Sequence, residues 1–328
     1  MVIATNKNGN EIGVLHFRSA DIDAAGDMNF EICVDAKKFD EETMRKDNRV
    51  FVPNTEFGGI IKRHITNTDD ETITLAGRTW RGYLASKIVR PPTGDDYKIV
   101  TGDLHVITKD LIQECGLNDL FHVATECGVD ISGYKISRYI SLLDALTAIY
   151  SSEGRRLDIS YMQSEGGVPG VVLLSAEPIV DYSEYIELSQ DNRLSFVCET
   201  ATDSINHLIC LGKGELASRT VIDLFIQKDG SIGSQKYFGG LDEFEAIYEN
   251  VNAEDDDLIE EGEEKLKELH AKNNRFSMNI DTLAIDANIG DSIGGRDYLS
   301  GTSMVKPIKN KIYKEENGIY QIEYKLEE

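Results

Sequence analysis

Short runs of β-branched and aromatic residues at both ends of the chain constrain its fold more than any other feature of the sequence. Near the N-terminus, the runs of strand length are residues 11–18, 29–34, 59–66 and 71–76. The last two flank a polar turn and are predicted to pair as a hairpin. Near the other end, two more runs flank Asn317-Gly318, a dipeptide typical of a tight hairpin turn. Strands this short and closely spaced indicate small barrels or sandwiches.

The middle of the chain changes to a helical pattern. Apolar residues recur every three or four positions over residues 103–115, and Gly116 is a natural stop. Ser141 is a candidate cap for a second helix, which Gly154 would end. Two strand-like runs follow, so residues 99–186 are predicted to form an α+β unit inserted between β-regions.

Trp80 and Tyr83 lie just before this change of pattern. Their spacing is compatible with one helical turn, and residues 83–89 then read as extended up to Pro91-Pro92. Burial of Trp80 in the core is one interpretation of this segment.

An acidic segment interrupts the second β-region. Leu258, Gly262, Leu266 and Leu269 are spaced for one face of a helix over residues 256–270. Acidic residues crowd its first turn and lysines follow later, which suits the helix dipole. We expect Leu258 and Leu266 to dock this helix on the rim of the β-region, where it helps to select an assembly partner.

The predicted fold class is therefore α+β and β-rich. We expect a first β-barrel domain at residues 1–98, the α+β insert at 99–186 and a second β-barrel domain at 187–328. The second barrel carries the short acidic helical insertion at about 241–274.

The charge balance limits the possible partners. The chain has 34 basic and 58 acidic residues, a formal net charge of −24. Protein–DNA affinity comes largely from lysine and arginine on phosphates, so this chain should repel DNA on average. No apolar run approaches the eighteen or so residues of a membrane helix, and the start lacks the pattern of a signal peptide. Five scattered cysteines favour reduced thiols in a cytosol.

The sequence predicts no catalytic, cofactor-binding or metal-binding residues. Cys115, His122 and Cys127 lack the short chelating spacing of a zinc site, so core packing is favoured. Residues 211–215 resemble a phosphate loop only superficially, because the lysine lies between the glycines, and a tight turn is the better interpretation. The run 255–257 lacks the alternating ligands of a calcium loop.

Three segments together carry a family resemblance. Residues 77–92 contain Gly-Arg at the start and Lys-Ile-Val-Arg-Pro at the end, and residues 207–219 contain a strand, Gly-Lys-Gly-Glu and an arginine. Residues 289–297, followed by the C-terminal hairpin, form the third segment. In order and spacing these segments resemble the tail hub proteins of long-tailed phages and phage-tail-like particles.

The resemblance implies a structural ring subunit without enzymatic activity. Such hubs are trimers in which each subunit offers two small barrels, so that three subunits match a sixfold tail tube above and a threefold spike or fibre below. The implied partners are two further copies of the chain, the tail tube or distal tail protein, and a tail spike or fibre. Such a ring needs wide subunit contacts, at which aromatic side chains are common, so the resemblance makes Trp80 and Tyr83 candidates for an interface. DNA would pass through the lumen without specific binding. The protein would belong to the virion tail and be assembled in the bacterial cytoplasm.

Two alternatives remain open at the level of sequence. The chain could be the hub of a contractile tail or of a tail-like bacteriocin, because the ring that faces the tube is similar there. The other alternative is a cell-wall hydrolase with an unrecognised site. Many relatives continue into a long C-terminal extension that carries a lytic or receptor-binding domain, whereas this chain stops after Leu326-Glu-Glu. We therefore expect another protein to carry any cell-wall-cleaving activity.

Overall fold

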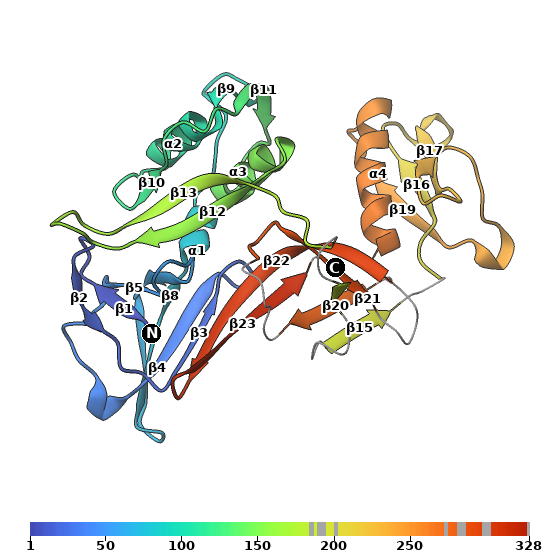
Figure 1. Cartoon of the computed structure of the whole chain (residues 1–328). Coiled ribbons are helices and arrows are strands. Elements are labelled where there is room, and N and C mark those ends of the chain that lie inside the picture. The colour runs from blue at the N-terminus through green and yellow to red at the C-terminus, as the bar shows by residue number, and fades with distance from the viewer. Residues whose placement is uncertain are drawn as a thin grey trace. The chain divides into compact units, whose positions relative to one another are not determined.

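The computed structural model describes residues 1–183, 187–188, 195–199, 203–271, 275–280, 287–296 and 303–326. The chain forms two compact units (Figure 1). Unit 1 consists of Met1–Ser195 and Asn279–Glu327, and unit 2 of Phe196–Met278. Asp297 of the third resembling segment lies outside the described residues.

A long antiparallel sheet in unit 1 brings the two ends of the chain together. Its strands run in the order β23-β22-β3-β4-β8-β7, and β22 pairs with β3, so that Tyr313 lies opposite Ile22. One face of the sheet is apolar and includes Ile22, Phe30, Ile32 and Leu75, which are all buried. The bounds are β3 (Ser19–Asp23), β4 (Asn29–Asp35), β7 (Arg63–Asn67), β8 (Thr72–Arg78), β22 (Ser303–Glu316) and β23 (Ile319–Leu326).

Other strands extend or flank this sheet. Four of them form a separate small sheet in the order β2-β1-β5-β6. These are β1 (Ile3–Thr5), β2 (Glu11–Val14), β5 (Arg49–Phe51) and β6 (Gly58–Ile60). The remaining ones are β14 (Glu187–Leu188), β15 (Ser195–Glu199), β20 (Arg275–Ile280) and β21 (Ser292–Arg296).

Both predicted hairpins are present. Strands β7 and β8 pair antiparallel across the polar turn at residues 68–71. Strands β22 and β23 pair across Asn317 and Gly318, whose φ angles of 53° and 79° are those of a tight hairpin turn. Glycine and asparagine adopt this left-handed conformation at little steric cost, which is why the dipeptide predicts the turn.

The insert contains two helices that end where the sequence indicates. Helix α2 (Leu104–Glu114) is capped by Asp103, and helix α3 (Leu142–Ser152) by Ser141, whose hydroxyl accepts the Asp144 N–H. Gly116 and Gly154, just beyond them, have positive φ angles. The helices pack with one another and with β12 and β13. The insert strands are β9 (Lys98–Asp103), β10 (Phe121–Val123), β11 (Asp130–Ile136), β12 (Arg155–Met162) and β13 (Val171–Pro178).

Helix α1 (Trp80–Ala85) is the predicted helical turn, capped by Thr79. The expectation that residues 83–89 are extended is wrong for its first part, because the helix continues to Ala85. The reason is burial: Trp80 and Leu84 are both fully buried, and helical geometry places them on one side of the turn.

A stack of three aromatic rings joins α1 to the small sheet and the insert. Tyr161 of β12 lies between Phe51 of β5, at 4.1 Å between ring centroids, and Trp80, at 5.5 Å. Two glycines leave room for these rings. A Cβ at Gly58 would lie 2.8 Å from the Trp80 indole, and one at Gly170 would lie 2.7 Å from the Tyr161 hydroxyl oxygen. Residues of the first β-region and of the insert therefore share one hydrophobic core.

A buried ion pair reinforces the same junction. Arg81 Nε lies 2.8 Å from Glu56 Oε2, and both side chains are 7% exposed. The guanidinium also donates to the Leu157 carbonyl of β12 at 3.2 Å. This one side chain therefore links α1, the segment between β5 and β6, and the insert.

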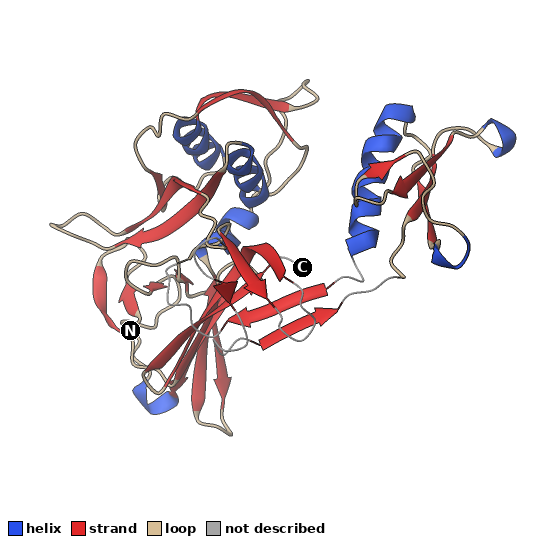
Figure 2. Ribbon diagram, turned by 45° about the vertical axis from the view of Figure 1, so that its right-hand side comes forward, coloured by secondary structure: helices blue, strands red, loops and turns tan. Residues whose placement is uncertain are grey.

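Unit 2 is a four-stranded sheet with one helix on one face (Figures 1 and 2). The strands, in the order β18-β17-β16-β19, are β16 (His207–Leu211), β17 (Val221–Ile226), β18 (Ile232–Gly233) and β19 (Glu245–Glu249). Helix α4 (Asp255–Ala271) confirms the predicted acidic helix. Leu258 and Leu266 are fully buried against the sheet, and Gly262 lets the helix approach closely, since a Cβ there would lie 2.6 Å from Cys210 Sγ.

The predicted α+β, β-rich class is confirmed. No closed barrel is found among the described strands, whose sheets are open at their edges. The division into domains at residues 98 and 186 stays a prediction.

We predict that Glu56→Gln lowers the free energy of unfolding by about 3 kcal/mol, because it leaves the buried Arg81 charge without a counter-ion. Chemical denaturation measures this. The control is Lys37→Gln, which breaks the pair with Glu71 at 83% and 66% exposure and should cost at most about 1 kcal/mol. Similar small losses in both variants would contradict a structural role for the buried pair.

A second prediction concerns α4. Leu266→Asp should destabilise unit 2 by several-fold more than replacing Asp255, Asp256 and Asp257 together by Asn, because only the leucine is buried in an apolar contact. The triple change affects exposed side chains in the first helical turn and should cost at most about 1 kcal/mol. Thermal melts of the two variants test this, and equal losses would disprove the assigned packing.

Candidate functional site

The four residues predicted to form an interface differ in how much surface they expose. Trp80, Leu258 and Leu266 are fully buried in the cores of their own units. Tyr83 is half-buried at the edge of the first core, and burial raises the pKa of its hydroxyl. Three of the four side chains are therefore held within this chain. Contact with a partner stays a prediction. Of the four side chains, only Tyr83 has exposed surface with which to make that contact.

The phosphate-like segment at residues 211–215 is a turn. Gly212 N–H donates to the Thr220 carbonyl and Thr220 N–H donates to the Lys213 carbonyl, while Gly214 has a φ angle of 106°. These bonds close the connection from β16 to β17. The first bond occupies the Gly212 N–H, so this amide is not available to bind a phosphate.

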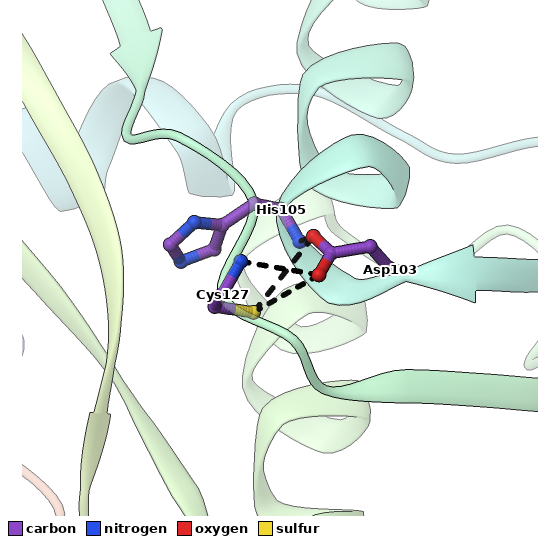
Figure 3. Close-up of side chains that lie close together, drawn as sticks. All are labelled: Asp103, His105 and Cys127. Carbon is purple, nitrogen blue, oxygen red and sulfur yellow. Dashed lines mark hydrogen bonds between the residues drawn. The ribbon is translucent and has the colours of Figure 1, made fainter.

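Cys115, His122 and Cys127 are placed separately. Cys115 and Cys127 are half-buried beside the first core, and burial raises the pKa of the Cys115 thiol. His122 is exposed on β10. Cys127 instead lies beside Asp103 and His105, a group that the sequence pattern did not bring together (Figure 3).

Asp103 binds both the start of α2 and the loop that contains Cys127 and Gly128. Its Oδ1 accepts the N–H of His105 at 2.9 Å and of Val106 at 3.4 Å, and its Oδ2 accepts those of Cys127 at 3.1 Å and Gly128 at 2.8 Å. Aspartate is preferred at this helix position because its carboxylate satisfies free N–H groups of the first turn. Asp103 could be predicted as a cap, but the loop that it binds could not.

His105 is buried, and both its ring nitrogens have backbone partners. Nε2 accepts the Ala176 N–H at 2.8 Å, so the hydrogen bonds assign the proton to Nδ1, which contacts the Thr125 carbonyl. No lone pair of the imidazole is left for a metal. With the Asp103 oxygens also engaged, Asp103, His105 and Cys127 form a structural cluster rather than a metal centre.

A cavity of about 480 Å³ lies beside this cluster, between α2 and the segment from β10 to Glu126. Its polar side chains include Lys109, Gln113 and His122. Catalysis of acyl or phosphoryl transfer requires a nucleophile, its base and an orienting group within hydrogen-bond reach. The described residues that line this cavity do not provide such a set.

The second face of the long sheet is charged and hollowed. Hollows of about 580 and 260 Å³ share Asp21, Glu31 and Lys314. The acidic residues of the larger hollow are Asp21, Asp23, Asp27, Glu31 and Glu323, and the basic ones are Arg63, Lys314 and Lys325. Burial raises the pKa of Asp21, although Lys314 acts in the opposite direction. We call this surface the acidic sheet face.

Comparison with known proteins yields matches in structure only. No protein-family model and no curated protein sequence matches the chain. A 43 kDa tail protein of prophage MuSo2 from Shewanella oneidensis superimposes with a TM-score of 0.60 at 13% identity, covering 99% of this chain and 98% of that one. A tail protein from Neisseria meningitidis MC58 superimposes with a TM-score of 0.54 at 15% identity, covering 100% and 96%.

The chain has the fold of phage tail proteins. Since each superposition covers nearly all of both chains, the likeness concerns the whole architecture rather than one domain. The resemblance carried by residues 77–92, 207–219 and 289–297 is thereby confirmed at the level of the tail-protein fold. None of the described helices is long and apolar enough to cross a membrane.

Asp103 provides a pH-dependent prediction. Burial alone would raise its pKa, but the N–H groups of Gly128, His105 and Val106 outweigh burial and lower it. A carboxylate with a lowered folded-state pKa stabilises the protein above its unfolded-state value, and this contribution is lost as the pH falls through the folded-state value. Asp103→Asn should therefore lower the melting temperature at pH 7, and the difference from the unmodified protein should shrink below about pH 4.

Thermal melts between pH 3 and pH 8 test this. A deficit of the same size at every pH would show that the carboxylate charge is irrelevant. Asp229→Asn is the matched control, because that carboxylate also has a lowered pKa but caps only an exposed turn through Ser231.

Proposed function

We propose that this chain is a structural ring subunit, a tail hub that joins the sixfold tail tube to the threefold tip or spike of a phage or prophage particle. The observation that carries the proposal is the likeness in fold to two tail proteins over the full length of the chain. The three resembling sequence segments support the hub position within the tail.

We infer that the assembled form is a homotrimer. Two β-rich regions in each of three subunits would offer six similar contacts to a tube and three to a spike. Tyr83 is the proposed aromatic contact at a subunit or partner interface. The wider partners are the tail tube or distal tail protein on one side and a tail spike or fibre on the other.

The acidity of the chain supports a role as a DNA conduit. A wall that presents carboxylates offers phosphates no counter-charge, so DNA passes without being held. The net charge of −24 and the acidic sheet face both provide such a surface. The arrangement of the subunits in the ring would decide which surface lines the lumen. The acidic sheet face is our candidate for that surface.

The proposed role is not enzymatic and places the protein in the virion tail, after assembly in the host cytoplasm. The hub of a contractile tail or tail-like bacteriocin is the same role in another particle. If the chain instead hydrolysed cell walls, incubation with purified peptidoglycan would release soluble fragments, and we expect none.

The native mass tests the hub proposal. The purified protein, alone or after addition of its tube or spike protein, should have a native mass three times the 36.6 kDa of one chain. Light scattering coupled to gel filtration measures this directly. A mass of one chain at tens of micromolar, unchanged by either partner, would refute the trimeric ring.

The same trimer should not retain duplex DNA even at low salt. A gel-shift titration at about 20 mM salt is the sensitive condition, because phosphate contacts strengthen as salt falls. Binding that weakens with added salt would contradict the conduit.

A further inference from the structure

His207 of β16 lies on the face of the unit 2 sheet that α4 does not cover, and it is surrounded by acidic groups. The residue is 7% exposed and its ring stacks on Phe225 of β17, with 4.2 Å between ring centroids. Asp223 Oδ1 lies 2.8 Å from its Nε2. Glu243 Oε1 and Glu245 Oε1 lie 2.9 and 3.1 Å from its Nδ1.

The pairing of the strands brings these groups together. His207 is opposite Phe225 on β17 and opposite Glu245 on β19, while Asp223 lies two residues before Phe225 and therefore on the same face. Glu243 precedes β19, and Lys236 Nζ binds its second oxygen at 2.6 Å. The arrangement is thus produced by three neighbouring parts of one sheet.

Two carboxylate oxygens converge on Nδ1 of His207. A proton on Nε2 is donated to Asp223, which leaves a lone pair on Nδ1 in the neutral ring. That lone pair would face one oxygen of Glu243 and one of Glu245, and the three electron-rich atoms would repel one another. A proton at Nδ1 relieves this only in part, since it points at one oxygen and leaves the other beside it. A divalent cation binds all three atoms at once.

The donor set suits a transition-metal ion. Zinc and the neighbouring first-row transition metals bind imidazole nitrogen together with carboxylate oxygen, whereas calcium and magnesium prefer oxygen ligands alone. The donor atoms of His207, Glu243 and Glu245 lie within 4.8 Å of one another. A histidine that binds a metal usually donates its other ring N–H to a carboxylate, which fixes the ring, and Asp223 occupies that position.

Charge and access support the same conclusion. With a neutral imidazole, three carboxylates face one ammonium group, that of Lys236, so the group is negative overall. The Glu243 side chain is 12% exposed and held in place, while that of Glu245 is 56% exposed, which leaves a route from solvent. The Asp103 cluster differs, because both nitrogens of His105 are bound to the backbone.

We propose that His207 Nδ1, Glu243 and Glu245 bind one divalent transition-metal ion of the zinc class, with Asp223 as a positioning residue. The ion ties β16 to β19 across their outer face. Three protein ligands leave a coordination position for water or for a side chain of another protein, the pattern of an open site. This site does not depend on the proposed hub function.

Isothermal titration of the full chain with zinc chloride tests the proposal. One ion should bind per chain, and binding should release the Nδ1 proton wherever it is present, as measured in two buffers of different ionisation enthalpy. Glu245→Gln, which changes a mostly exposed side chain, should weaken binding at least about ten-fold, and Asp223→Asn by about 10- to 100-fold. The melting temperature should rise with zinc in the unmodified protein.

Glu249→Gln is the matched control, because Glu249 lies on the same strand and face but pairs with Arg219 at 2.5 Å. It should bind zinc like the unmodified protein. Failure of the unmodified chain to bind zinc would show that Nδ1 holds a proton only and would overturn the proposal. If the Glu245→Gln and Asp223→Asn variants bound zinc as tightly as the unmodified protein, the ion would lie on other acidic residues. That result would also overturn the proposal. Neither result would test the proposed homotrimer or the hub function.

Discussion

The stack of Phe51, Tyr161 and Trp80 is the contact on which the architecture of unit 1 depends. The small sheet, α1 and the insert each provide one ring, and each ring would otherwise leave an apolar surface exposed. Aromatic pairs contribute about 0.5–1.5 kcal/mol beyond the area that they bury. The buried Arg81–Glu56 pair lies at the same junction and fixes the orientation of α1. The first β-region and the insert are held together by this junction.

The helices could be predicted because their signals are local. Asp103 and Ser141 cap their helices within a few residues, and Leu258, Gly262, Leu266 and Leu269 of α4 follow one another at steps of four, four and three. The hairpin at Asn317-Gly318 is equally local, since the dipeptide itself adopts the required angles. The helical conformation of residues 83–85 could not be predicted, because one turn is too short for a periodic pattern and the burial of Leu84 decides its conformation.

The contacts of the two histidine clusters could not be predicted, because they join residues far apart in sequence. His105 binds Ala176, and His207 meets Glu243 only once β19 pairs parallel with β16. A register shift of one residue would turn His207 to the face covered by α4. Composition is informative in another way, because the excess of acidic residues predicts which partners the surface repels.

The pairing of β3 with β22 has a consequence for how the protein is made. Residues 19–23 emerge from the ribosome long before residues 303–316, their partners in the sheet. At about 5–20 residues per second, β3 waits roughly 15–60 s with one edge unpaired. An open strand edge is a template for pairing with other chains. Correct production of this protein therefore favours fast synthesis, or chaperones that cover the nascent edge, until β22 arrives.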